Sequence, residues 1–93
     1  MTLDAELKLK QKYIQNLPAK MAEIELYFDD KNIDKLQVAI HKLAGSAGMY
    51  GFSELSLMAA DIEDFIVSKE TVDRLMLETQ LQRLYGRVSR LIQ

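Results

Sequence analysis

Apolar residues recur at alternating intervals of four and three along most of this chain, and this spacing limits the folds open to it. The clearest case is the last stretch, where Leu77, Leu81, Leu84, Val88 and Leu91 follow the interval strictly. Such spacing forms one apolar stripe along a helix, and helices bury their stripes by packing side by side. Strand-like alternation of apolar and polar residues is missing from the sequence. We therefore predict an all-α fold.

The first third of the chain is expected to hold a short helix followed by a break. Leu3, Leu7 and Ile14 fall on one side of a helix from about residue 3 to residue 14. The sequence "NLPAK" then indicates a boundary, because Asn16 suits a helix cap and Pro18 suits a first helical turn. The next stripe is formed by Leu17, Met21, Ile24 and Phe28.

Three further helices are expected at about 33–49, at about 53–68 and from about Thr71 to the end, with Asn32 and Ser53 as caps and "SKET" as a break. Their inward residues before the last helix are Ile33, Leu36, Ile40, Leu43, Ala47, Leu55, Met58, Ala59, Ile62, Phe65 and Ile66. We predict a single domain over residues 1–93, an antiparallel up-down four-helix bundle with a short extra N-terminal helix.

Composition narrows the classes of function. A net charge of −2 gives no electrostatic reason to expect nucleic acid or an anionic membrane as a partner. The apolar runs are too short to span a bilayer, and without cysteine the chain has no disulfide framework and no thiolate chemistry. The chain opens without the pattern of an export signal. We expect a cytoplasmic monomer.

The only histidine lies among small residues, in "AIHKLAGSAGMYGF". Gly45, Gly48 and Gly51 follow His41 within ten positions, although glycine inside a helix costs about 1 kcal/mol. At 100° per residue, His41 lies about 120° from the apolar stripe of its helix, and Gly45 and Gly48 clear the flank beside it. A lone histidine on a flank is most often an ordinary surface residue, and a glycine pair often serves close helix packing. An open site at His41 is the alternative.

Glu63 strengthens the interpretation as a site. Tyr50, Gly51 and Phe52 form the expected turn, with His41 about ten residues before it and Glu63 about eleven after it. Antiparallel helices would bring the two side chains to nearly equal height. A carboxylate there can accept a hydrogen bond from Nδ1–H, which leaves Nε2 as the nucleophile.

The stretch "HKLAGSAGMYGFSEL" resembles the histidine-containing phosphotransfer (HPt) domains of multistep phosphorelays. The resemblance covers about residues 36–66, and the helical layout fits the whole chain. The matching residues are His41, Leu43, Gly45, Ser46, Ala47, Gly51, Phe52, Leu55, Ala59 and Glu63.

The resemblance implies a function. His41 would accept a phosphoryl group on Nε2 from the aspartyl phosphate of one receiver domain and pass it to the Asp of another. The partners would be receivers of a hybrid sensor kinase and of a response regulator. Gly45 would give a receiver room to dock, and Glu63 would orient the ring. The receiver would supply Mg²⁺, so we expect neither a metal nor a cofactor on this chain.

One position departs from the family pattern, which often has Lys three residues after the histidine. Here that residue is Ala44, and Lys42 points about 100° away from His41. No Gly-rich phosphate loop or Walker lysine is found, so we expect a phosphotransfer intermediate without an ATP site. Candidate docking residues near His41 are Asp34, Gln37, Val38, Lys42, Gly48, Met49, Tyr50, Phe52 and Leu57. Core packing is the alternative for the apolar ones and is equally open for Met49 and Phe52, whereas Leu57 points away from its stripe.

Two other functions stay open. A degenerate HPt domain could act as a helical adaptor that binds a partner and transfers nothing, and Ala44 favours this alternative. A metal or haem site at His41 is the weaker alternative, because Glu63 would be a poor second ligand and the chain has no second histidine.

Overall fold

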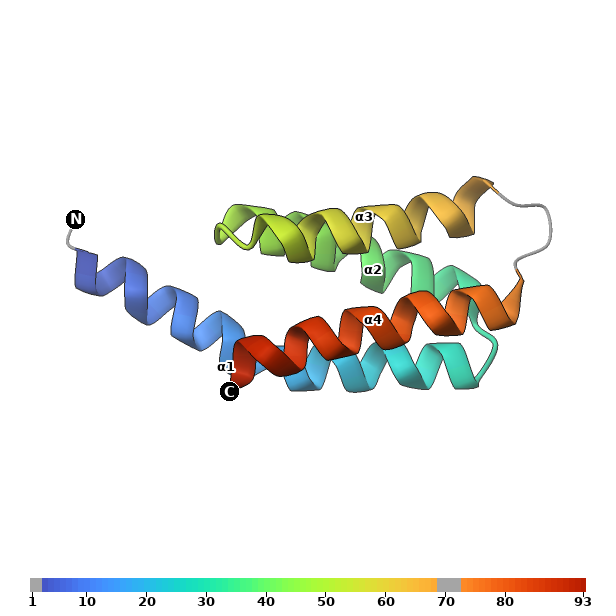
Figure 1. The fold of residues 1–93 in the computed structure, drawn as a ribbon, viewed down its shortest axis with the longest axis horizontal. Helices are drawn as coiled ribbons and strands as arrows, with labels where there is room; N and C mark the ends of the chain where they lie inside the picture. The colour runs from blue at the N-terminus through green and yellow to red at the C-terminus, as the bar shows by residue number, and fades with distance from the viewer. Residues whose placement is uncertain (1–2, 69–72) are drawn as a thin grey trace.

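The computed structural model of the chain describes residues 3–68 and 73–93, and these form a four-helix bundle (Figure 1). Successive helices run in opposite directions, and each packs against two others in the cyclic order α1, α2, α3, α4. The fold class is therefore the one that the sequence predicts. The four helices are α1 (Leu3–Asp29), α2 (Ile33–Met49), α3 (Ser53–Ser68) and α4 (Arg74–Ile92).

The predicted apolar stripes form the core. In α4, Leu77, Leu81, Leu84 and Val88 are buried, and Leu91 is half-buried at the end of the helix. Full burial of one such side chain stabilises the fold by about 1.5–3 kcal/mol. Half-buried members of the predicted stripes pack at the margin of the core: Ile33, Met58 and Phe65. The other buried residues are Tyr13, Leu17, Met21, Ile24, Phe28, Leu36, Ile40, Leu43, Ala47, Leu55, Ala59, Ile62 and Ile66.

The predicted break in the first third of the chain is wrong. α1 is one helix of 27 residues that contains Pro18, so Asn16 caps nothing and the extra N-terminal helix is continuous with the first helix of the bundle. A proline inside a helix has no N–H for the carbonyl four residues earlier, and prolines are a usual cause of bends. In Figure 1 the N-terminal half of α1 is inclined to the rest and projects past the other three helices.

Tyr13 explains why α1 continues across Pro18. Its ring is 6% exposed and stacks on Tyr50 and Phe52, with ring centroids 4.8 and 5.6 Å away. Its hydroxyl hydrogen-bonds to that of Ser46 at 2.7 Å. These contacts from the turn between α2 and α3 hold the projecting half of α1 in helical register.

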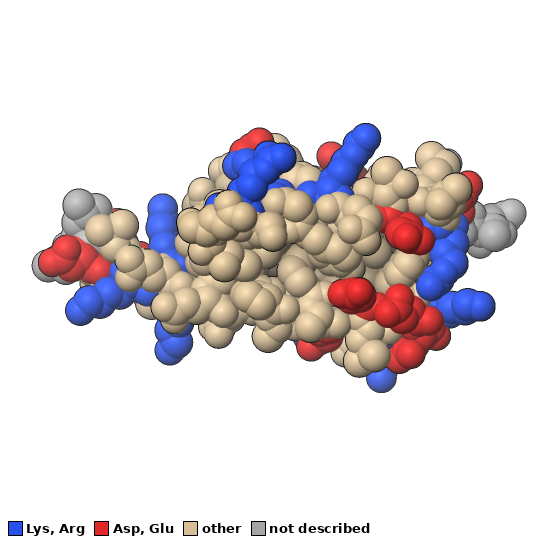
Figure 2. All heavy atoms as spheres, turned by 60° about the horizontal axis from the view of Figure 1, so that its bottom comes forward, with Lys and Arg blue, Asp and Glu red and all other residues tan. Residues whose placement is uncertain are grey.

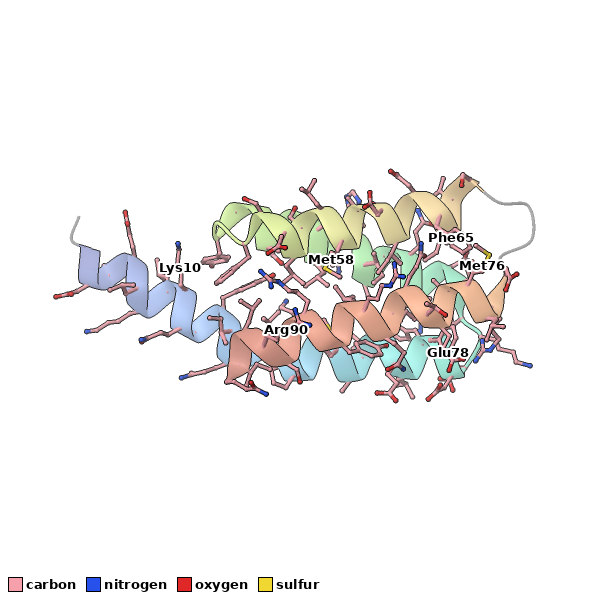
Figure 3. All side chains as sticks on the ribbon, in the orientation of Figure 1. Lys10, Met58, Phe65, Met76, Glu78 and Arg90 are labelled. Atoms are coloured by element: carbon pink, nitrogen blue, oxygen red, sulfur yellow. The ribbon has the colours of Figure 1, made fainter. Side chains whose placement is uncertain are left out.

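The expected stripe of residues 3–14 contributes less than predicted. Leu7 is exposed, Ile14 is half-buried, and the Leu3 side chain lies outside the described part of the structure. Figure 3 shows Lys10 on this half of α1, and its ammonium lies 6.0 Å from the ring centroid of Phe52.

Local chemistry fixes the start of each later helix. Asn32 caps α2 as predicted, because its side-chain oxygen accepts the N–H of Lys35 at 3.2 Å. The Phe52 carbonyl accepts the N–H of Ser56 at 3.0 Å, so Phe52 rather than Ser53 occupies the cap position of α3. Gly51, with φ of +85°, makes the preceding turn.

Asp73 caps α4 by accepting the N–H groups of Leu75 and Met76. The predicted break "SKET" and the predicted helix start at Thr71 fall mostly on residues 69–72, which lie outside the described residues.

Candidate functional site

His41 lies on the solvent-facing flank of α2, with 72% of its side chain exposed. The rotation of α2 is fixed by its core residues, since Ile40 and Leu43 on the opposite face of the helix are buried. The position expected from the helical periodicity is therefore confirmed. The ring is presented outward by a rigid helix.

The predicted contact between His41 and Glu63 is present. Nδ1 of His41 lies 2.9 Å from Oε1 and 3.0 Å from Oε2 of Glu63, whose side chain is only 20% exposed. An ionised carboxylate only accepts hydrogen bonds, so this geometry favours the tautomer with hydrogen on Nδ1. Nε2 then carries the free lone pair of the neutral ring. The geometry is that of a positioned nucleophile; the roles of the two residues remain predictions.

The two helical glycines beside His41 have different surroundings. A Cβ built at Gly45 would meet nothing within 4 Å, so this position is open to solvent. A Cβ at Gly48 would lie 3.2 Å from the hydroxyl oxygen of Ser56 on α3. Gly45 therefore leaves space for another molecule, whereas Gly48 faces a neighbouring helix.

The other predicted docking residues are placed unevenly. Val38, Met49 and Leu57 are 52%, 82% and 65% exposed. Asp34 is exposed and Gln37 is half-buried. Tyr50 and Phe52 instead stack on Tyr13 and are half-buried.

Lys42 lies on the side of α2 that faces α1. It lines a shallow depression with Glu23, Tyr27 and Ala39, while the carbonyl of Ala44 faces α3, where it accepts the hydroxyl of Ser56. Val38 and Asp34, two other candidate docking residues, line the same depression. A replacement of the usual family lysine by Lys42 stays untested.

The larger surface hollows lie away from His41. A groove of about 720 Å³ runs between α3 and α4, and Figure 3 shows Met58 and Arg90 on its opposite sides. Figure 2 shows acidic side chains gathered at the end of the molecule where α1 meets the start of α4, and Glu25, Asp29 and Glu78 line a hollow there. A histidine whose side chain is 72% exposed is suited to a macromolecular partner that covers it, rather than to a small molecule that is enclosed.

The described residues also bear on metal binding and on insertion into a membrane. Within residues 3–68 and 73–93, no three His, Cys, Asp or Glu side chains gather so as to hold a metal ion. None of the helices described is both long enough and apolar enough to cross a membrane.

Comparison with known proteins identifies the family of this chain. The sequence model of the Hpt domain family matches residues 8–92, nearly the whole chain. The chain therefore belongs to the Hpt domain family, the histidine phosphotransfer domains of phosphorelays. Members of this family are phosphocarriers that interact with receiver domains. No significant match was found among curated proteins or among solved structures.

The sequence interpretation missed two residues at this site. Tyr13 precedes Leu17 by four residues and so extends the stripe of α1, a signal hidden by treating Pro18 as a break. Half-buried Ser56 donates a hydrogen bond to the carbonyl of Ala44, and no sequence pattern distinguishes it from serines that are exposed.

Proposed function

We propose that the chain is a phosphocarrier in which Nε2 of His41 accepts a phosphoryl group from the aspartyl phosphate of one receiver domain and returns it to the aspartate of another. The observation that carries this proposal is the exposed ring whose Nδ1 is held by both oxygens of Glu63. Membership of the Hpt family supports it.

The chemistry needs little from this chain. The Nε2 lone pair attacks phosphorus, the P–O bond to the receiver carboxylate breaks, and the carboxylate leaves with the bonding electrons. The proton stays on Nδ1, where the Glu63 carboxylate stabilises the positive charge that develops on the ring. Phosphoryl transfer depends mainly on positioning and on charge neutralisation, and the receiver contributes most of the second.

Docking is proposed to occur over the flank that holds His41. Gly45 leaves open space one turn from the ring, and Val38 and Leu57 offer exposed apolar side chains to a partner. The proposed partners are receivers of a hybrid sensor kinase and of a response regulator.

A second candidate is an adaptor that binds a receiver without taking its phosphoryl group. The observation that favours it is Ala44, which leaves the flank without the lysine that is frequent in the family. The two candidates differ in one measurement, the appearance of phosphate on the chain.

The test is transfer from a receiver domain labelled with ³²P on its aspartate, in the presence of Mg²⁺. We expect label on the intact protein that is stable in alkali and lost in acid, and none on His41→Gln. Label that persists in His41→Gln would exclude His41 as the carrier. Binding of the receiver without any label would favour the adaptor. The variant should keep the helical circular dichroism of the parent, since the His41 side chain is 72% exposed.

A further inference from the structure

A hydroxyl group joins α3 to the backbone of α2 close to the proposed site. Oγ of Ser56 donates a hydrogen bond of 2.7 Å to the carbonyl oxygen of Ala44. In the helical pattern this carbonyl also accepts the N–H of Gly48, and its second lone pair is available to Ser56. The bond is half-buried, so water competes with it only in part.

Gly48 provides the space for this bond. A Cβ at position 48 would lie 3.2 Å from Oγ of Ser56 and 3.8 Å from its Cβ. The first distance is tighter than ordinary contact and the second is normal, so only the hydroxyl would have to move. The helix cost of Gly48 is therefore explained by the approach of Ser56 to the backbone of α2.

The same two helices carry the proposed catalytic pair a short distance away. Ser56 and Glu63 are seven residues apart on α3, so they point in nearly the same direction, about 20° apart, and are separated by about 10 Å along the axis. Ala44 is three residues from His41 on α2. A bond fixed at Ser56 thus restricts both the rotation and the sliding of α3 where Glu63 reaches Nδ1.

We propose that Ser56 is a positioning residue: with Gly48, its hydroxyl holds α3 in the register that lets both carboxylate oxygens of Glu63 engage Nδ1 of His41. Ser56 acts through the backbone of α2, where it bonds to the Ala44 carbonyl, rather than through a hydrogen bond to the ring. Its consequence for phosphoryl transfer rests on the proposed function, but its consequence for the tautomer of His41 does not.

The first experiment measures the ring directly. In ¹⁵N-labelled protein, the chemical shifts of Nδ1 and Nε2 report the tautomer of neutral His41, and NOEs report the proximity of its ring to Glu63. We expect Ser56→Ala to lower the population of the Nδ1–H tautomer and to weaken these NOEs. Ser68→Ala is the matched control, because the hydroxyl of Ser68 bonds to the Phe65 carbonyl of its own helix, at 3.5 Å, and not to α2 among the described residues. Unchanged tautomer and NOEs in Ser56→Ala would overturn the proposal.

A second pair of variants separates positioning from stability. Gly48→Ala alone should disturb His41 as Ser56→Ala does, because it displaces the hydroxyl. In Gly48→Ala/Ser56→Ala the clash is gone and alanine favours the helix, so thermal stability should recover while the tautomer stays altered. Recovery of the tautomer together with stability would show a merely structural role and overturn the proposal.

Transfer from a labelled receiver then gives the functional consequence. We expect Ser56→Ala to be slower by roughly three- to tenfold, as for other residues that act through a contacting group. If the parent protein takes no label, the proposed function fails, and the tautomer measurement still decides the role of Ser56. A normal rate in a variant with an altered tautomer would also overturn the proposed role in transfer.

Discussion

The contact between α2 and α3 and the core face of α4 are built in opposite ways. Beside His41, α2 meets α3 through Gly48, Ser56 and the backbone of Ala44. α4 instead enters the core with large aliphatic side chains, of which Leu77 and Leu84 are fully buried. Small and polar contacts define a position and tolerate added atoms poorly. Large apolar contacts provide stability and tolerate removed atoms poorly.

This difference separates the contacts that stabilise the fold from the contacts that place Glu63 against His41. The free energy of folding comes largely from the stripes, whereas the placement of Glu63 against His41 depends on short-range contacts that contribute little burial. Variants in the core face of α4 should therefore change stability, whereas variants near His41 should change phosphoryl transfer.

The largest effect is expected from α4. Leu84→Ala removes a fully buried side chain and should lower the free energy of unfolding by about 3 kcal/mol. Urea denaturation monitored by circular dichroism measures this change. Leu75→Ala on the same helix is the control, because Leu75 is exposed and its loss should cost less than about 0.5 kcal/mol. Similar losses of unfolding free energy in the two variants would contradict the view that the buried stripe of α4 supplies the stability.

On the other side, Gly45→Leu should preserve the fold and impair transfer. A side chain at position 45 meets nothing within 4 Å, and replacing glycine in a helix gains up to about 1 kcal/mol. The added leucine would occupy the space proposed for a receiver, so we expect labelling of His41 to slow by at least about tenfold, equivalent to about 1.4 kcal/mol. Gly45→Ala should fall in between. A normal rate in Gly45→Leu would remove the docking argument.

Glu63→Ala should slow labelling by about tenfold without lowering the midpoint of thermal unfolding by more than a few degrees. The carboxylate contacts Nδ1 of the ring, where it is proposed to orient it, and contributes little buried apolar area. Asp64→Ala is the matched control, since its carboxylate is exposed on the next residue of α3. Equal rates in the parent and in Glu63→Ala would exclude the orienting role.

The smallest effects concern two tyrosines in different environments. Tyr13→Phe loses the hydrogen bond to Ser46 and should cost about 1 kcal/mol. The hydroxyl of Tyr85 is buried and has no hydrogen-bond partner among the described residues. Tyr85→Phe should therefore leave stability at pH 8 unchanged or slightly improved. A larger loss of unfolding free energy in Tyr85→Phe than in Tyr13→Phe would contradict the view that only the Tyr13 hydroxyl contributes a stabilising hydrogen bond.

The stability of the fold at alkaline pH gives a second measurement on Tyr13 and Tyr85. Desolvation by burial, followed by the charges of Glu25 and Asp29, raises the pKa of Tyr85 to about 12, and burial also raises the pKa of Tyr13. The unfolded chain loses these protons near pH 10, so stability should fall as pH rises from about 10 to about 12. Urea midpoints at pH 8 and pH 11 should show a smaller loss in Tyr85→Phe than in the parent.

Sequence periodicity predicted much of this molecule because short amphipathic helices obey local rules. The bounds of α2, the stripe of α4 and the height match of His41 with Glu63 all follow from counting residues along antiparallel helices. The continuity of α1 across Pro18 does not follow, because it depends on a long-range contact of Tyr13 with the turn at 50–52.

The contact of Ser56 was also beyond prediction. A serine on the flank of a helix has no apolar periodicity, and its partner is a backbone carbonyl that every residue possesses. Only the distance between the two helix axes decides whether such a hydroxyl reaches its acceptor. That distance depends on the absence of a side chain at Gly48, for which the sequence left two interpretations open, close helix packing and a cleared flank beside His41.

The exposure of His41 has a consequence for timing. On the proposed function, a phosphoramidate at His41 would stand on a side chain that is 72% open to solvent, uncovered against hydrolysis by residues 3–68 and 73–93. The lifetime of a stored signal would then be limited by the intrinsic lability of the P–N bond and by how soon a partner arrives. The abundance of receivers in the cell, rather than any protection by this bundle, would then decide how long the phosphoryl group stays on His41.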